Sequence, residues 1–244
     1  MIIDLNQIKE NLKRDEHNAI KGMYKEFNVS NEDQQTINLI LSQYKEFSNQ
    51  YLAEAHENNN NLHTIGSLEI LSFCKQINIH PTAVELKISN VPNNSLVAVV
   101  EGLKASYQFE NDKLIISGND IIHYPSITFY PHLFKQDDEK VLAAIGHELT
   151  HLALQHNEVQ NILAMEIKYF TKAKNEEILN SKNWKNLETI CERQAEILHK
   201  DAAWAAIMRN SRNDSYYDDH LFLKHHAQLA EIDELHKLKE KINA

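Results

Sequence analysis

The sequence predicts a mainly helical α+β protein that carries one small antiparallel sheet. Only five glycines and four prolines occur in 244 residues, so long stretches lack the residues that break helices. Apolar residues recur at helical spacing on both sides of a central segment, and that segment favours strands. We therefore expect helices at both ends of the chain and a sheet between them.

Two helices are predicted at the N-terminus, from Leu5 to about Phe27 and from Glu32 to about Glu57, where apolar residues repeat every three or four positions. Short connections favour an antiparallel pair. A run of four asparagines at 58–61 then favours a turn, because the asparagine side chain competes with the helix backbone for hydrogen bonds. We place a boundary there, between an N-terminal helical region (1–61) and the main domain (62–244).

The expected sheet follows a short helix from Ser67 to about Gln76. Its last strand comprises Ser126, Ile127, Thr128, Phe129 and Tyr130. Pro125 and Pro131 bound this strand and predict an edge position, because proline cannot donate a hydrogen bond to a neighbouring strand. The earlier strands are expected at 82–88, 95–101, 104–110 and 113–117, with a hairpin turn at 111–112. After Pro131, helical spacing returns at 138–156, 159–179, 184–209 and 221–242.

Composition limits the partners and the compartment. A formal charge of −10 argues against nucleic acid or an anionic membrane surface as the main partner, because both require a basic surface. Two cysteines, Cys74 and Cys191, are too few for a disulfide framework and suit a reducing compartment. No signal-peptide segment and no apolar run near 20 residues is visible. We expect a soluble, cytoplasmic protein, and export without a cleavable signal stays open.

The helix at 138–156 carries the segment His147-Glu148-Leu149-Thr150-His151. Two histidines four residues apart project from one face of a helix and can reach one ion. Two neutral imidazoles and a carboxylate bind zinc and leave a position for water, whose pKa falls to about 7. Glu148 stands beside the pair and can take the proton of that water. The motif therefore predicts one Zn²⁺ per chain and Glu148 as the general base of a hydrolase.

The motif does not identify the third metal ligand. Metzincins place a histidine ten residues after the first one, where this chain has Asn157, so a downstream carboxylate remains. Glu188, Glu192 and Glu196 recur every four residues on one face of the helix predicted at 184–209. The spacing indicates the helix that supplies the ligand and leaves the choice among the three open.

The segment from His147 to His156 resembles the His-Glu-x-x-His-x-x-x-x-His motif of zinc metallopeptidases related to the CAAX prenyl protease and the heat-shock protease HtpX. The resemblance covers about residues 120–208 and implies a zincin-like catalytic domain of the gluzincin type. In that family the third ligand is a Glu followed four residues later by an Asp, which implies Glu188 as ligand and Glu192 as the carboxylate that orients a ligating histidine. The other alignment makes Glu192 the ligand and Glu196 its orienting partner.

The same resemblance implies that the strand at 126–130 holds a polypeptide substrate in extended form by backbone pairing. We therefore expect a zinc-dependent metalloendopeptidase. A non-proteolytic zinc hydrolase and a catalytically inactive metal-binding interaction protein are the alternatives. His156, about 140° around a continuous helix from His151, is expected to be structural. A further side chain could stabilise the oxyanion of the tetrahedral intermediate, and we assign no single residue to this role. The candidates are Tyr216, Tyr217, His220, His225 and His226.

Overall fold

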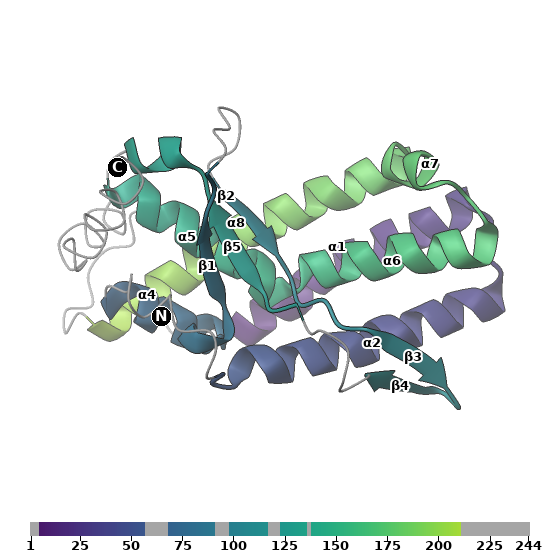
Figure 1. Ribbon diagram of the computed structural model, residues 1–244, viewed down its shortest axis with the longest axis horizontal. Coiled ribbons are helices and arrows are strands. Elements are labelled where there is room, and N and C mark those ends of the chain that lie inside the picture. Colours follow the sequence, from purple (N-terminus) through teal and green to yellow (C-terminus); the bar gives the residue numbers. More distant parts are fainter. Residues whose placement is uncertain (1–4, 57–67, 91–97, 117–122, 136–137, 211–244) are drawn as a thin grey trace.

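The computed structural model describes residues 5–56, 68–90, 98–116, 123–135 and 138–210 as a mainly helical α+β fold (Figure 1). The predicted fold class is confirmed. The helices are α1 (Leu5–Glu26), α2 (Asn31–Ala53), α4 (Leu68–Ile77), α5 (Asp138–Leu154), α6 (His156–Thr171), α7 (Asn175–Leu179) and α8 (Lys182–Asn210), with 3-10 turns η1 (Pro81–Ala83) and η2 (Pro131–Lys135). The strands are β1 (Glu85–Ile88), β2 (Ala98–Glu101), β3 (Tyr107–Glu110), β4 (Lys113–Ile116) and β5 (Ser126–Phe129). The helix predicted at 221–242 lies outside the described residues.

Four long helices, α1, α2, α6 and α8, run alongside one another (Figure 1), with α1 packed on α8 and α2 on α6. Their shared core includes Met23, Ile37, Leu163 and Leu187, none of which exposes any surface. Each such side chain stabilises the fold by about 1.5–3 kcal/mol relative to an exposed one. The N-terminal helices thus share a core with the C-terminal half, although the boundary at residue 61 stays a prediction.

The three-stranded sheet has the order β1-β5-β2, with β1 parallel and β2 antiparallel to β5. The prediction that residues 126–130 form an edge strand is therefore wrong, because β5 is the central strand. Its ladder spans Ser126 to Phe129, so Pro125 and Pro131 flank it without removing a donor from either neighbour. The sheet is mixed because of the β1–β5 pair, whereas the β3–β4 hairpin is antiparallel as predicted. Its turn residues, Asn111 and Asp112, have φ values of 49° and 59°.

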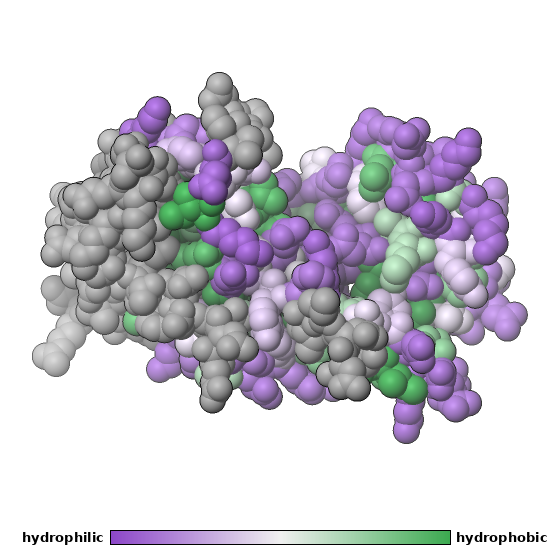
Figure 2. Space-filling model, in the orientation of Figure 1, coloured by the Kyte–Doolittle hydropathy of each residue, from purple (hydrophilic) through white to green (hydrophobic). Residues whose placement is uncertain are grey.

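Helix α5 packs against β2 and against α4 and α8. Its buried side chains Leu142 and Leu149 belong to the same apolar cluster as Ile127 and Phe129 of β5 and Phe73 of α4. The face in Figure 2 is hydrophilic over most of the helices, and hydrophobic residues gather over the three-stranded sheet. The packing of α5 on β2 and α8 holds the helix that carries the histidine motif between the sheet and α8.

A buried carboxylate joins the end of β2 to the start of α6. Glu158 is 1 % exposed, and its Oε1 accepts hydrogen bonds from the Ser48 hydroxyl at 3.0 Å and from the Leu103 backbone N–H at 2.9 Å. Its Oε2 is buried without a hydrogen-bond partner in the described structure. A Cβ on Gly102 would lie 2.8 Å from this carboxyl group, so a larger residue there would displace the carboxyl group from its position. Burial raises the pKa of Glu158, which favours the neutral acid.

We predict that the wild type loses stability as the pH rises and Glu158 ionises, and that Glu158→Gln removes this loss. A carboxyl whose pKa is raised in the folded state contributes stability below its unfolded pKa and loses it as the pH rises through the folded pKa. Glutamine keeps the acceptor oxygen and cannot ionise. Between the unfolded-state and the folded-state pKa of Glu158, the free energy of unfolding of the variant should rise relative to that of the wild type by about 1.4 kcal/mol per pH unit. Urea unfolding from pH 5 to 8 measures this.

The control is Glu46→Gln, which removes an exposed carboxylate from α2. Equal pH dependence in wild type and Glu158→Gln would contradict the prediction.

Candidate metal centre

The two histidines of the motif lie on α5 with their side chains directed at a common point. The Nε2 atoms of His147 and His151 are 3.1 Å apart. His151 is 6 % exposed, and His147 is half-buried. Helical spacing accounts for this arrangement, because residues four apart lie one above the other on one face.

Glu192 of α8 completes the cluster. Its Oε2 lies 3.5 Å from His147 Nε2 and 3.6 Å from His151 Nε2. These three residues each offer one ligand atom, and the three atoms lie within 4.8 Å of one another. The hydrogen bond from His147 is the main cause that holds the pKa of Glu192 well below its usual range, and the same contact raises the pKa of His147.

The other two carboxylates of the ladder have different partners. Glu188, one turn earlier on α8, accepts a hydrogen bond from the Trp184 indole Nε1 at 2.7 Å. Glu196, one turn later, forms an exposed ion pair with Lys200 at 3.5 Å. The structure thus brings Glu192 and not Glu188 to the two histidines, which favours the alternative alignment of the sequence.

Close contact between α5 and α8 brings the cluster together. Gly146 precedes the first histidine, and a Cβ there would lie 2.8 Å from the Nε2 atom of His199 on α8. The Thr150 hydroxyl, fully buried, lies 3.3 Å from the Ala195 carbonyl oxygen of α8 and also reaches the His147 carbonyl oxygen. A larger residue at 146 would force the His199 side chain to move.

Glu148 lies between the two histidines in the sequence and is partly buried. Burial raises its pKa, and the neighbouring His151 and His147 oppose that shift. A carboxylate of raised pKa is a stronger proton acceptor than an exposed one. Its place and basicity suit a general base.

His156 follows a break in the helical chain and returns to His151. Gln155 adopts a left-handed conformation, with φ of 60°, between α5 and α6. His156 Nδ1 then lies 2.9 Å from His151 Nδ1, and its Nε2 lies 3.1 Å from Gln194 Oε1. The predicted separation of about 140° assumed a continuous helix and is therefore wrong. Burial lowers the pKa of His156 to about 3, so the imidazole is neutral.

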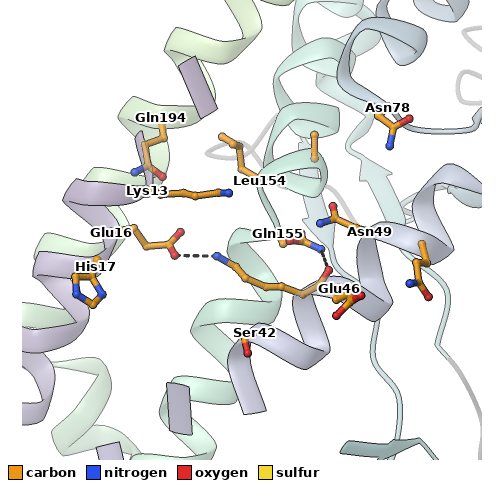
Figure 3. Close-up of a pocket in the computed structure, with 13 residues that line it drawn as sticks. Lys13, Glu16, His17, Ser42, Glu46, Asn49, Asn78, Leu154, Gln155 and Gln194 are labelled. Carbon is orange, nitrogen blue, oxygen red and sulfur yellow. Dashed lines mark hydrogen bonds and ion pairs between the residues drawn. The ribbon is translucent and has the colours of Figure 1, made fainter. Parts of the chain in front are cut away.

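A cavity of about 1060 Å³ lies beyond Gln194, between α1, α2, α8 and the α5–α6 break (Figure 3). Lys13 and Glu16 enter it from α1, and Lys45 pairs with Glu16 at 2.8 Å. Gln155 also lines it and donates to the Lys45 backbone carbonyl. The residues that line this cavity do not include His147, His151 or Glu192.

The strand predicted to bind substrate is paired along both sides. Ser126, Ile127 and Phe129 of β5 are buried, and the strand bonds to β1 and β2 over its whole length. A peptide therefore cannot pair with the backbone of residues 126–129. The candidate oxyanion residues, all between 216 and 226, lie outside the described residues.

The donor set fits a zinc ion. Ligand atoms about 2.0–2.1 Å from a tetrahedral zinc ion lie roughly 3.3–3.5 Å from one another. The three distances here are 3.1, 3.5 and 3.6 Å. Two imidazoles and a carboxylate are also the donors that catalytic zinc sites use, with one position left for water.

Comparison with known proteins identifies the family. A model of Peptidase family M48 matches residues 90–238, more than half of the chain. The chain belongs to this peptidase family. The resemblance seen in the sequence is confirmed, and the match includes the helices that carry His147, His151 and Glu192. No curated protein and no solved structure matched the chain.

Membership of a peptidase family implies a polypeptide substrate and a metal-dependent site. The cluster of two histidines and a carboxylate could hold that metal. Among the described helices, none combines the length and the apolar character that crossing a bilayer requires.

We predict that Thr150→Val weakens the contact between α5 and α8. Valine has nearly the same shape but lacks the hydroxyl that lies between the two helices. Loss of a buried hydrogen bond should lower the free energy of unfolding by about 1 kcal/mol. Thr150→Ser keeps the hydroxyl and is the control. Urea unfolding should rank the serine variant above the valine variant, and the reverse order would contradict this role of the hydroxyl.

Proposed function

We propose that this protein is a zinc-dependent metallopeptidase. The observation that supports this most directly is the convergence of His147, His151 and Glu192, within a chain that belongs to a peptidase family. His147 and His151 would bind through Nε2 and Glu192 through a carboxylate oxygen, one zinc ion per chain. Zinc held there would polarise a water molecule and lower its pKa to about 7.

Glu148 is proposed as the general base. Its carboxylate takes a proton from the attacking water and later gives it to the leaving amine nitrogen, because the same group can act first as base and then as acid. Burial raises its pKa, which strengthens it as a base. Its neighbours in the sequence, His147 and Leu149, fix it on α5 beside the cluster.

The outer edge of β2 is the proposed binding site for the peptide backbone, in place of β5. Glu85 N–H donates to Pro125 O and Ser89 N–H to Phe129 O. The backbone N–H and C=O groups of the odd-numbered residues of β5 therefore point towards β1. The backbone groups of the even-numbered residues of β5 point towards β2. Since Thr128 and Ser126 pair with Val99 and Glu101, the intervening residues of β2 point their backbone groups outward.

Ala98 and Val100 are these outward residues. Val100 O already accepts a hydrogen bond from the Asn157 side chain at 3.0 Å, which agrees with an outward direction. Among the described strands, none pairs with this edge. Because β2 packs against α5, a peptide paired with it would run beside the helix that carries Glu148.

We predict that Glu148→Gln keeps the metal and loses most of the activity. Glutamine has the same shape but cannot accept a proton, so the rate should fall by about 10² to 10⁴. Elemental analysis measures zinc per chain, and a peptide library measures cleavage. Glu176→Gln, which removes an exposed carboxylate from α7, is the control. Full activity in Glu148→Gln would exclude this base, and zinc without any cleavage by the wild type would favour a non-proteolytic or inactive protein.

We predict that Glu192→Ala weakens zinc binding more than Glu188→Ala does. Of these two carboxylates, Glu192 is the one that approaches the histidines. Loss of a direct ligand should raise the zinc dissociation constant by more than about 100-fold, beyond the effect of an orienting residue. Glu188→Ala removes a hydrogen bond to Trp184 and should bind zinc almost as the wild type does. Chelator competition measures both constants. The opposite ranking would restore Glu188 as the ligand.

A further inference from the structure

A row of buried polar side chains extends from the metal centre into the protein behind His151. His151 Nδ1 lies 2.9 Å from His156 Nδ1, and His156 Nε2 lies 3.1 Å from Gln194 Oε1. We propose that His156 and Gln194 are positioning residues that hold His151 in the tautomer whose Nε2 lone pair faces the metal. This inference rests on the proposed zinc site.

The directions of the hydrogen bonds follow from the acceptor at the far end. Gln194 presents its carbonyl oxygen, so His156 Nε2 must carry the hydrogen and donate it. A neutral imidazole has one N–H, which leaves His156 Nδ1 as an acceptor. His151 Nδ1 must then donate to it, so in the neutral form of His151 the Nε2 atom has no hydrogen and can bind a metal.

The opposite direction would disable the ligand. If the amide nitrogen of Gln194 faced His156, then His156 Nδ1 would donate to His151 and His151 Nε2 would carry the hydrogen. That hydrogen would point towards His147 Nε2 and Glu192, where the metal belongs. The orientation of one amide group therefore decides whether His151 is ready to bind.

Burial makes this control effective. His156 is 1 % exposed, and Gln194 is 4 % exposed although it also lines the cavity beside α1 and α2. An unmatched polar atom on the buried His156 imidazole would cost about 1–3 kcal/mol. Gln194 lies two residues after Glu192, so α8 supplies both a direct ligand and the far end of the row. Metal-binding histidines usually donate their second N–H to a carboxylate, a carbonyl oxygen or water, whereas here a second imidazole is the acceptor.

The first test reads the tautomers directly in the metal-free protein. Imidazole ¹⁵N chemical shifts from long-range ¹H–¹⁵N NMR spectra distinguish a protonated nitrogen from an unprotonated one. We expect the hydrogen on Nδ1 of His151 and on Nε2 of His156. A hydrogen on Nε2 of His151 would overturn the proposal. This test needs neither zinc nor activity, and it uses the wild-type chain, so it does not depend on whether a variant folds.

The second test measures zinc affinity by chelator competition. His156→Leu and Gln194→Leu remove the acceptor and its support, and each should raise the zinc dissociation constant by about 10- to 100-fold. Gln194→Glu keeps an oxygen that faces His156 and should restore affinity to near that of the wild type. Gln160→Leu, at a half-buried position on α6 beside Cys191, is the matched control and should leave the constant unchanged.

The outcomes separate the two proposals. No zinc binding by the wild type would contradict the proposed function, while the NMR result would still decide the tautomers. Tight binding by the wild type, together with equal binding by folded His156→Leu and Gln194→Leu, would overturn the positioning role alone. Equal losses in Gln194→Leu and Gln194→Glu would also overturn it, because the acceptor oxygen would then be irrelevant.

Discussion

The close approach of α5 and α8 is the constraint on which the metal centre depends. The histidines come from one helix and Glu192 from the other. The cluster therefore exists only while the two helices keep their distance and their relative position along the helix axis. Gly146 allows the approach, and the Thr150 hydroxyl lies across the contact from Ala195. Apolar side chains of both helices, Ile145 on α5 and Leu198 on α8 among them, share one buried cluster. Hydrophobic burial therefore holds the polar groups in place.

The imidazoles of His151 and His156 both have polar partners within the protein. His151 has the Glu192 carboxylate on one side and His156 on the other, and His156 continues to Gln194. The buried part of this row resists rearrangement, because rotation of His151, His156 or Gln194 would leave a buried donor or acceptor unmatched. In the proposed site, His156 and Gln194 would thus act through the orientation of His151 and not by contact with the metal.

The sequence was sufficient for the helix that carries the motif, because its period and the spacing of the two histidines are local properties. It could not choose between Glu188 and Glu192, since both lie on one face and differ by one helical turn of about 5.4 Å. Which of the two carboxylates lies level with the histidines depends on how α8 packs on α5. Pro125 and Pro131 misled the prediction for β5, because flanking prolines leave the ladder between them intact. The turn at Gln155 was invisible, because glutamine rarely takes a left-handed conformation.

The N-terminal helices contribute to the site although they lie outside the matched residues 90–238. Helix α1 packs along α8, which carries Glu192 and Gln194. From α2, the Lys45 carbonyl accepts a hydrogen bond from the Gln155 side chain, where the left-handed conformation costs about 1–2 kcal/mol. That contact helps to hold the turn that brings His156 to His151. Helices α1 and α2 are therefore part of what shapes the candidate metal centre, although both precede the segment that the family model matches.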